Sequence, residues 1–271
     1  MKKENKLKKT LKGLMAIVRN PWLLNHVLSD NSVWGRQIEK KYGIRGGLKT
    51  VDITTLFPGF RETIDTFAFL DGGSSPLDLS LIRGLCKTMP NCAYFEIGTC
   101  RGESVANVAD VCSKCYTLDL PPELYTDKAE GSLVAYFSKN IKNVTQLWGD
   151  STKFDYAGLG MKFDVIFIDG DHRYEFVQAD TANVFKHLVH ENSIVIWHDY
   201  ATDVVYPRNE VFAGILDGVP ASLHSNLYHV SNTICAIYIN KQFPILNTEN
   251  SRIPNKKFKL SLESVSLPDT H

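Results

Sequence analysis

The sequence lacks the features that mark secreted, membrane-spanning and nucleic-acid-binding proteins. Six cysteines, scattered through 271 residues, are too few for a secreted scaffold of this size that depends on disulfides. No apolar run approaches the roughly 18 residues that a membrane span requires. Thirty basic and thirty acidic residues give a net charge of zero, which argues against a dedicated nucleic-acid binder. We therefore expect a cytoplasmic protein whose partners do not include nucleic acid.

Two short sequence signals, one for a structural zinc site and one for secretion, are also incomplete. Cys112 and Cys115 form one CxxC pair, but a structural zinc site needs four ligands, and no second cysteine or histidine pair stands at suitable spacing. The N-terminus is basic, as in a signal peptide, yet lysines interrupt its apolar positions and no small-residue cleavage site follows. Neither a structural zinc ion nor a secretion signal is expected.

Residues 1–20 instead predict a basic amphipathic helix. They hold six Lys and one Arg but a single acidic residue, Glu4. Three interpretations stay open: a helix that packs on its own domain or on a homodimer partner, a helix that makes peripheral contact with an anionic membrane, and a mobile tail. The apolar side chains that share one helical face are Leu7, Leu11, Leu14, Met15 and Val18.

The whole chain divides into three parts that differ in how regularly predicted strands and helices alternate. Residues 1–75 form an N-terminal helical or irregular extension, in which residues 21–75 contain Pro21, Pro58 and several glycines and could cover the mouth of an active site. Residues 76–240 alternate apolar strands with amphipathic helices. Residues 241–271 form a polar, weakly ordered tail.

The alternating part predicts an α/β fold with a mostly parallel sheet that is covered by helices on both faces. Two last strands with no helix between them predict an antiparallel hairpin at the sheet edge. Helices are expected over 76–89, 103–112, 131–141, 173–190 and 207–219, and strands over 93–98, 115–120, 144–150, 163–171, 193–200, 222–230 and 233–240.

Polar residues follow each of the first five predicted strands. Because the carboxyl ends of parallel strands meet at one edge of a sheet, we expect these residues to share one crevice. Gly98 and Gly102 let the backbone turn tightly there, and Asp119 stands 21 residues beyond Gly98, where an acid often accepts hydrogen bonds from ribose hydroxyls. The later strand ends carry Asp150, Ser151, Asp169, Asp171, His172, His198 and Asp199.

Glu96 is unusual because it stands inside an apolar strand. An unpaired carboxylate would be costly there. We therefore expect Glu96 to accept hydrogen bonds from a ligand or from backbone amides.

In this order, the segments YFEIGTCRGES, YTLDL, GDS, FDVIFIDGDHRYEFVQAD and SIVIWHDY resemble the class I S-adenosylmethionine-dependent methyltransferases. The closest likeness is to the macrocin-type sugar O-methyltransferases and the cephalosporin-hydroxylase-like enzymes, and it covers residues 76–240. The resemblance implies a Rossmann-like, doubly wound, seven-stranded sheet with a C-terminal antiparallel hairpin. It also implies S-adenosylmethionine (SAM) as cofactor. The residues implied around SAM are Glu96, Gly98, Thr99 and Gly102 at its methionine part, Asp119 at its ribose, Asp150 and Ser151 near its adenine, and Asp169.

A divalent cation is a further implication of the resemblance. Related sugar enzymes bind one through positions that match Asp169, His198 and Asp199. Here His198 replaces the first acid of the final pair, and imidazole suits Mn²⁺ or other transition metals better than Mg²⁺. The same cluster could also act without metal, through acid–base chemistry and hydrogen bonds.

Methyl transfer to a hydroxyl needs a group that accepts the proton of the hydroxyl as it attacks the methyl carbon. Asp171 matches the position proposed as general base in the related sugar enzymes, and His172 is the neighbouring candidate. The leading expectation is therefore a SAM-dependent O-methyltransferase that acts on a hydroxyl of a sugar, a glycan or another polar small molecule.

Two other classes of function remain. A dinucleotide-dependent oxidoreductase also uses a glycine turn and an acid about 20 residues further on. Against that class, the turn here is GTCRG and not GxGxxG. The other alternative is a binding module that keeps the methyltransferase fold without catalysis.

Overall fold

One eight-stranded sheet organises the chain. The computed structural model describes residues 6–24, 31–66, 73–201, 206–246 and 256–266. The strand order is β1-β7-β8-β6-β5-β2-β3-β4, and all pairs are parallel except those that β8 makes with β6 and β7. The strands are β1 Thr50–Val51, β2 Ala93–Ile97, β3 Lys114–Asp119, β4 Val144–Trp148, β5 Val165–Ile168, β6 Ile194–Trp197, β7 Leu227–Val230 and β8 Ala236–Tyr238.

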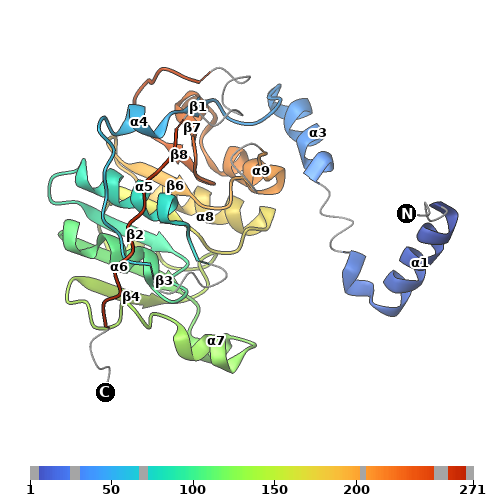
Figure 1. Ribbon diagram of the computed structural model, residues 1–271, viewed down its shortest axis with the longest axis horizontal. Helices are drawn as coiled ribbons and strands as arrows, with labels where there is room; N and C mark the ends of the chain where they lie inside the picture. The colour runs from blue at the N-terminus through green and yellow to red at the C-terminus, as the bar shows by residue number, and fades with distance from the viewer. Residues whose placement is uncertain (1–5, 25–30, 67–72, 202–205, 247–255, 267–271) are drawn as a thin grey trace.

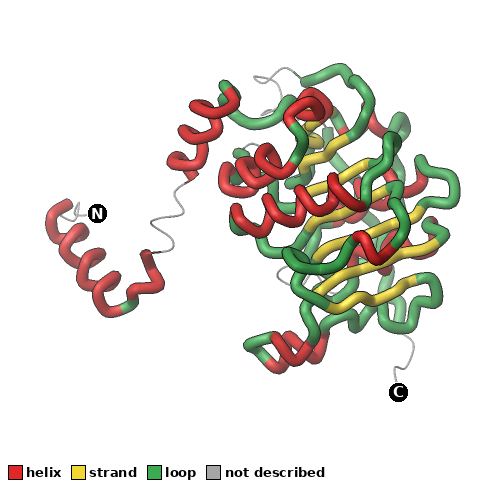
Figure 2. The backbone as a smooth tube through the Cα atoms, turned by 180° about the vertical axis from the view of Figure 1, so that it is seen from behind, coloured by secondary structure: helices red, strands yellow, loops and turns green. Residues whose placement is uncertain are grey.

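Helices cover both faces of this sheet, so the molecule has three layers (Figures 1 and 2). Helices α8 and α9 pack against one face together with α3, and α5 and α6 pack against the other. The helices are α1 Lys6–Arg19, α3 Asn31–Tyr42, α4 Ile53–Leu56, α5 Pro76–Lys87, α6 Glu103–Val108, α7 Lys128–Leu133, α8 Tyr174–His187 and α9 Asn209–Gly218.

The apolar strands supply the cores of both layers. Side chains on a strand point alternately to the two faces of the sheet. In β5, Ile166 and Ile168 therefore belong to the core under α8 and α9, whereas Val165 and Phe167 belong to the core under α5 and α6. All four are at most 4% exposed, which explains why this strand reads as a continuous apolar run.

The strand order confirms the predicted Rossmann-like, doubly wound fold. The chain proceeds from β2 outward through β3 to β4, then returns to place β5 on the other side of β2. The point where the order reverses lies between β2 and β5, and ligands bind beyond such points in open α/β sheets. The predicted antiparallel hairpin is β7 with β8.

The N-terminal extension adds one strand to the seven that were expected. β1 pairs with β7 in parallel, and Val51 in it is fully buried. The amide of His229 donates to the carbonyl of Lys49, and the amide of Ser231 donates to the carbonyl of Val51. The predicted hairpin therefore does not form the sheet edge, because β1 covers it. A pair of strand residues inside an irregular segment leaves too short a pattern to recognise.

The helix predicted over 131–141 is wrong in its extent. α7 begins earlier, at Lys128, and ends at Leu133. Val134 is extended and Ala135 has a left-handed φ of 59°, so the chain leaves the helix there. The amide of Ala135 donates to the carbonyl of Cys100, and that of Phe137 donates to the carbonyl of Arg101. These long-range hydrogen bonds tie the segment to the loop after β2, which explains why local periodicity failed.

α1 forms as predicted but contributes no residue to either hydrophobic core of the described chain. None of its side chains is buried, and both views show it apart from the three layers (Figures 1 and 2). Of the three interpretations left open, the first, in its form of packing on its own domain, has no buried α1 residue to support it among the described residues. Within those residues, no helix has both the length and the apolar character needed to span a bilayer.

Candidate active site

An open cavity of about 470 Å³ lies beyond the carboxyl ends of β2, β3, β4 and β5. Its position is the one at which an open α/β sheet binds its ligand. Apolar side chains, among them Leu118 and Phe176, contribute to its walls. Six of the residues expected at the site line it: Gly98, Asp119, Asp150, Ser151, Asp169 and Asp171.

Gly98 directly follows β2 and faces the backbone of Asp169, which directly follows β5. Its φ is +96°, and a Cβ at this position would collide with the carbonyl group of Asp169. Any other residue at this position would therefore have an unfavourable left-handed backbone conformation, and its Cβ would clash with Asp169. The absence of a side chain lets the backbone after β2 pack directly against the backbone after β5 at the edge of the cavity.

Gly102 has a different role, because it does not line the cavity. Its φ is +85° and its α-carbon faces Ser138, which leaves no room for a Cβ. The close contact holds the segment after α7 against the loop that follows β2. Together with the hydrogen bonds of Ala135 and Phe137, it fixes that loop from outside.

Glu96 lies beneath the cavity and is fully buried. Three hydroxyl groups donate to its carboxylate at 2.7 Å, namely those of Tyr94, Ser104 and Thr117. The expected donors were a ligand or backbone amides, so the structure corrects the source of these bonds. Burial raises the pKa of Glu96 to about 7, although the three hydroxyls lower it. Glu96 braces β2, β3 and α6 and does not reach the cavity.

Thr99 continues this buried network. It is 2% exposed, its hydroxyl lies 2.6 Å from that of Thr117, and it accepts a hydrogen bond from the amide group of Gln146 at 3.0 Å. Like Glu96, it supports the floor of the cavity from below.

Asp119 closes the loop of β2 onto the end of β3. One of its oxygens accepts from the amide of Cys100 at 2.7 Å, and the other accepts from the amide of Leu120 and the hydroxyl of Tyr125. Carboxylate oxygens can accept more than one hydrogen bond each. Asp119 lines the cavity and so keeps the position expected for an acid that binds ribose hydroxyls.

Asp150 and Ser151 form the wall at the end of β4. Hydrogen bonds from Thr152 and Lys153 outweigh burial and lower the pKa of Asp150. The same bonds make Asp150 the first residue of a tight turn. The Ser151 carbonyl accepts from the Tyr156 hydroxyl at 2.9 Å, which anchors this wall to the core.

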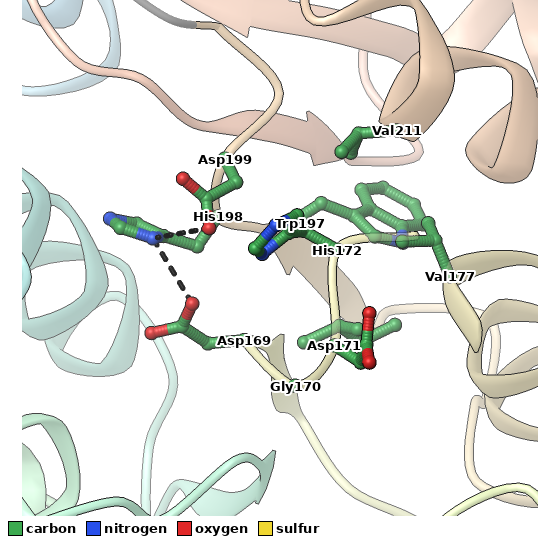
Figure 3. Close-up of a pocket in the computed structure, with 10 residues that line it drawn as sticks. Asp169, Gly170, Asp171, His172, Val177, Trp197, His198, Asp199 and Val211 are labelled. Carbon is green, nitrogen blue, oxygen red and sulfur yellow. Dashed lines mark ion pairs between the residues drawn. The ribbon is translucent and has the colours of Figure 1, made fainter. Parts of the chain in front are cut away.

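A second, smaller hollow adjoins the cavity and shares Asp169, Gly170 and Asp171 with it. Figure 3 shows His198 directed toward Asp169 and Asp199. His198 Nδ1 is 3.0 Å from Asp169 Oδ1 and 3.7 Å from Asp199 Oδ2. The predicted cluster of Asp169, His198 and Asp199 is thus brought together at the ends of β5 and β6.

Asp78 completes this cluster, and the sequence did not predict it. Its Oδ2 lies 3.6 Å from His198 Nε2, and the side chain is 1% exposed. Asp78 also accepts from the amide of Ser75 in a capping box at the start of α5 and from the amide of Ile234. The spacing Ser75-x-x-Asp78 is a recognisable signal for a helix start. It carries no information about the proximity to His198, which depends on the sheet.

Three carboxylates surround one imidazole. Burial lowers the pKa of His198, but Asp169, Asp199 and Asp78 outweigh it and raise that pKa well above its ordinary value. A protonated His198 would still leave a surplus of negative charge in a half-enclosed space. Such a donor set of carboxylate oxygens and one imidazole nitrogen suits a divalent transition-metal ion. The ligand atoms of Asp169, His198 and Asp199 lie within 4.8 Å of one another, so the residues fit a cation.

Asp171 and His172 both lie at the hollow but differ in their surroundings. Burial raises the pKa of Asp171, yet hydrogen bonds from the Arg173 guanidinium and backbone outweigh it and lower that pKa. Arg173 Nε is 3.0 Å from both carboxylate oxygens. His172 is exposed and lines the hollow together with Asp169 and His198.

The N-terminal extension reaches this side of the site. The ring of Trp34 in α3 stacks on that of Tyr174, the first residue of α8, with centroids 4.8 Å apart. The side chain of Asn31 donates to the carbonyl of Pro207 at 3.1 Å. Part of the extension therefore flanks the first turn of α8, next to His172.

Asp180 is a second buried acid that the sequence did not single out. It lies on α8, is 1% exposed, and no hydrogen bond of normal geometry reaches its oxygens from the described residues. Burial raises its pKa to about 7. A Cβ on Gly170 would lie 3.5 Å from it, so Asp180 is close beneath the backbone that follows β5. Its helical position resembles any core position of α8, which explains why periodicity gave no signal.

The comparisons with known proteins agree with this geometry. Residues 95–200 match the family model described as a methyltransferase domain. The chain therefore contains a methyltransferase domain. The matched residues run from β2 to the residues just after β6 and contain every part of the cavity and the cluster except Asp78. A comparison with curated proteins gave no match.

Several solved structures, methyltransferases among them, are similar to this chain. The SAH-bound methyltransferase PaMTH1 of Podospora anserina is 19% identical, with 65% of this chain and 83% of that chain covered at a TM-score of 0.45. The O-methyltransferase TomG of Streptomyces achromogenes, solved with SAM, is 15% identical, with 63% and 83% covered at 0.41. Fibrillarin of Methanococcus jannaschii is 18% identical, with 66% and 83% covered at 0.43.

The buried state of Glu96 predicts a pH dependence of stability. Its pKa is about 7 in the folded chain and about 4.5 when exposed, so the folded state holds the extra proton between these values. The free energy of unfolding should therefore fall as pH rises through this window, by on the order of 3 kcal/mol from this group. Glu96→Gln should reduce that slope in urea unfolding measured across the window.

A matched control is Glu175→Gln, because Glu175 is exposed on α8. This variant should keep the wild-type slope. Equal slopes for wild type, Glu96→Gln and Glu175→Gln would contradict the assignment of a raised pKa to Glu96.

Proposed function

We propose that the methyltransferase domain uses SAM to methylate a hydroxyl group of a sugar, a glycan or another polar small molecule. The observation that carries this proposal is the junction of the two hollows at Asp169, Gly170 and Asp171. A cofactor in the larger cavity would have one end at the cluster of titratable side chains. An acceptor in contact with that cluster would then lie within reach of the methyl group.

SAM has groups that match the walls of the larger cavity. Its ribose hydroxyls are donors for Asp119, and its adenine can lie between apolar walls such as Leu118 and Leu120, close to Ser151. Its methionine part would lie against the backbone of Gly98, which lines the cavity. Glu96, Thr99 and Gly102 support this site from below and outside.

The reaction would be an in-line displacement. The acceptor oxygen forms a bond to the methyl carbon while the bond between carbon and sulfur breaks, so that S-adenosylhomocysteine (SAH) leaves. The hydroxyl proton passes to a base, which keeps the charge balanced. Positioning the two reactants provides much of the rate gain in such a reaction.

We favour His172 over Asp171 as that base. Both oxygens of Asp171 accept hydrogen bonds from Arg173, and its pKa is lowered, so it holds a proton poorly. Imidazole is the commonest general base in enzymes, and His172 faces the same hollow as Asp169. In this assignment Asp171 orients the backbone of Arg173 and the start of α8.

A divalent cation is the second element of the proposal. Asp169, His198 through Nδ1, and Asp199 would hold it. When bound, such an ion polarises the acceptor hydroxyl as a Lewis acid and eases loss of its proton. Asp78 would then serve as the partner of His198 Nε2 and fix the orientation of the ring.

Binding of the cofactor product is testable by thermal unfolding. At about 100 times its Kd, SAH should stabilise the domain by about 3 kcal/mol, which raises Tm by several degrees. NADH, the ligand of the competing oxidoreductase class, should leave Tm unchanged at the same concentration. A shift with NADH and none with SAH would contradict the proposed cofactor.

The choice of base is testable by variants. His172→Gln should lower kcat by about 100-fold to 10,000-fold in an assay of SAH release with a panel of sugar acceptors. The Kd for SAH should stay within about twofold, because His172 does not line the larger cavity. His187→Gln, at the far end of α8, is the matched control and should keep wild-type turnover. An Asp171→Asn variant that loses more kcat than His172→Gln would reverse the assignment.

The metal ligands are testable by calorimetry with Mn²⁺. Wild type should bind one ion, and His198→Ala or Asp199→Asn should weaken binding by at least about tenfold. The control Asp127→Asn alters an acid that caps α7, away from the cluster, and should bind as wild type does. Heat of binding that is identical in all four proteins would place the ion elsewhere.

A further inference from the structure

The methyltransferase site does not use the apolar face of α1. Four of its side chains are strongly exposed: Leu11 at 49%, Leu14 at 58%, Met15 at 55% and Val18 at 79%. In a helix of 3.6 residues per turn these positions, with Leu7, fall within an arc of about 100°. A helix that packs within a soluble domain hides such a face, whereas α1 has no buried residue at all.

All charged side chains on the rest of the α1 surface are basic. The helix contains Lys6, Lys8, Lys9, Lys12 and Arg19 and no acidic residue. Helical geometry places these cations on the arc that the apolar residues leave open. A narrow apolar stripe beside a surface whose only charges are positive is complementary to a lipid bilayer with an apolar interior and anionic headgroups.

We propose that α1 binds the surface of an anionic phospholipid bilayer and anchors the methyltransferase domain to it. The helix would lie in the plane of the interface, with Leu11, Leu14, Met15 and Val18 in the acyl boundary and the lysines among the headgroup phosphates. Its 14 residues correspond to about 21 Å, which is too short to span the hydrocarbon core. The proposal does not depend on the chemistry of the active site.

Charge favours a bilayer over a second copy of this chain. The helix carries no acid, so contact between two copies through their α1 stripes would not bring the five cations of either helix onto an anionic surface. A stripe of five apolar side chains is also small beside the roughly 1,200 Å² that a stable interface buries. In an anionic membrane the acyl chains contact the apolar stripe while the headgroups contact the lysines. Each basic residue near the membrane surface strengthens binding about fivefold.

The position of α1 outside the three layers would let it bind a membrane without disturbing the domain. Figures 1 and 2 show the helix apart from the three layers, on the side where the N-terminal extension enters the domain. The next described segment, η1 Pro21–Leu23, places Trp22 at 60% exposure directly after the helix. Tryptophan is enriched at membrane interfaces, where its ring lies at the level of the headgroups.

The test is co-sedimentation of the full chain with vesicles of two compositions. One set contains phosphatidylcholine and phosphatidylglycerol in equal parts, and the other contains phosphatidylcholine alone. Wild type should bind the anionic vesicles at least about tenfold more strongly, and added salt should weaken that binding. Equal binding to both sets, or binding to neither, would overturn the proposal.

Two variants separate the apolar and the basic contributions. Leu11→Glu with Leu14→Glu should reduce binding to anionic vesicles to background. Lys8→Gln with Lys9→Gln should weaken it by about tenfold or more. Matched controls in the C-terminal segment are Leu260→Glu with Leu262→Glu and Lys257→Gln with Lys259→Gln, which alter equally exposed residues and should bind as wild type does.

The same variants show whether the domain stays folded and whether a dimer explains the stripe. Because α1 has no buried residue, Leu11→Glu with Leu14→Glu should keep the wild-type Tm in the absence of lipid. Light scattering should find wild type and variant in the same oligomeric state. A wild-type dimer that this variant converts to monomer would assign the stripe to a second copy and overturn membrane binding.

Discussion

The contact between the ends of β2 and β5 is the constraint on which the rest of the site depends. The two strands are neighbours at the point where strand order reverses, and Gly98 approaches the carbonyl group of Asp169 so closely that only a hydrogen fits. Gly98 and Asp169 both line the larger cavity, and Asp169 also lines the smaller hollow, so this contact sets Asp169 at the border between the two. The buried carboxylate of Glu96, held by three hydroxyls, keeps β2 in register beneath it.

The acidic residues of the site fall into two groups with different surroundings. Glu96, Asp119 and Asp150 are largely engaged by hydroxyls, amides or lysine, and they hold loops and strands in place. Asp169 and Asp199 instead surround His198, where their charge exceeds what one imidazole can balance. The first group shapes a cavity, whereas the second supplies a charged surface on which an acceptor or a cation can be held.

Much of this arrangement could be predicted from the sequence, because strands buried on both faces read as apolar runs and their polar ends must meet at one edge. The positions of Asp119, Asp169 and His198 followed from that rule. The partners of Glu96 did not, since Thr117 becomes its neighbour only through the pairing of β2 with β3. The approach of Asp78 to His198 and the early end of α7 likewise depend on contacts between distant segments. The helical form of α1 was predicted, and its exposure needed the structure.

A crystal structure of the chain grown with SAH tests the central claim most directly. The account predicts density for SAH in the larger cavity, with its ribose at Asp119, its adenine beside Ser151 and its sulfur directed toward the hollow of Asp169 and His198. Density for SAH at any other place on the molecule, with this cavity left to solvent, would contradict it.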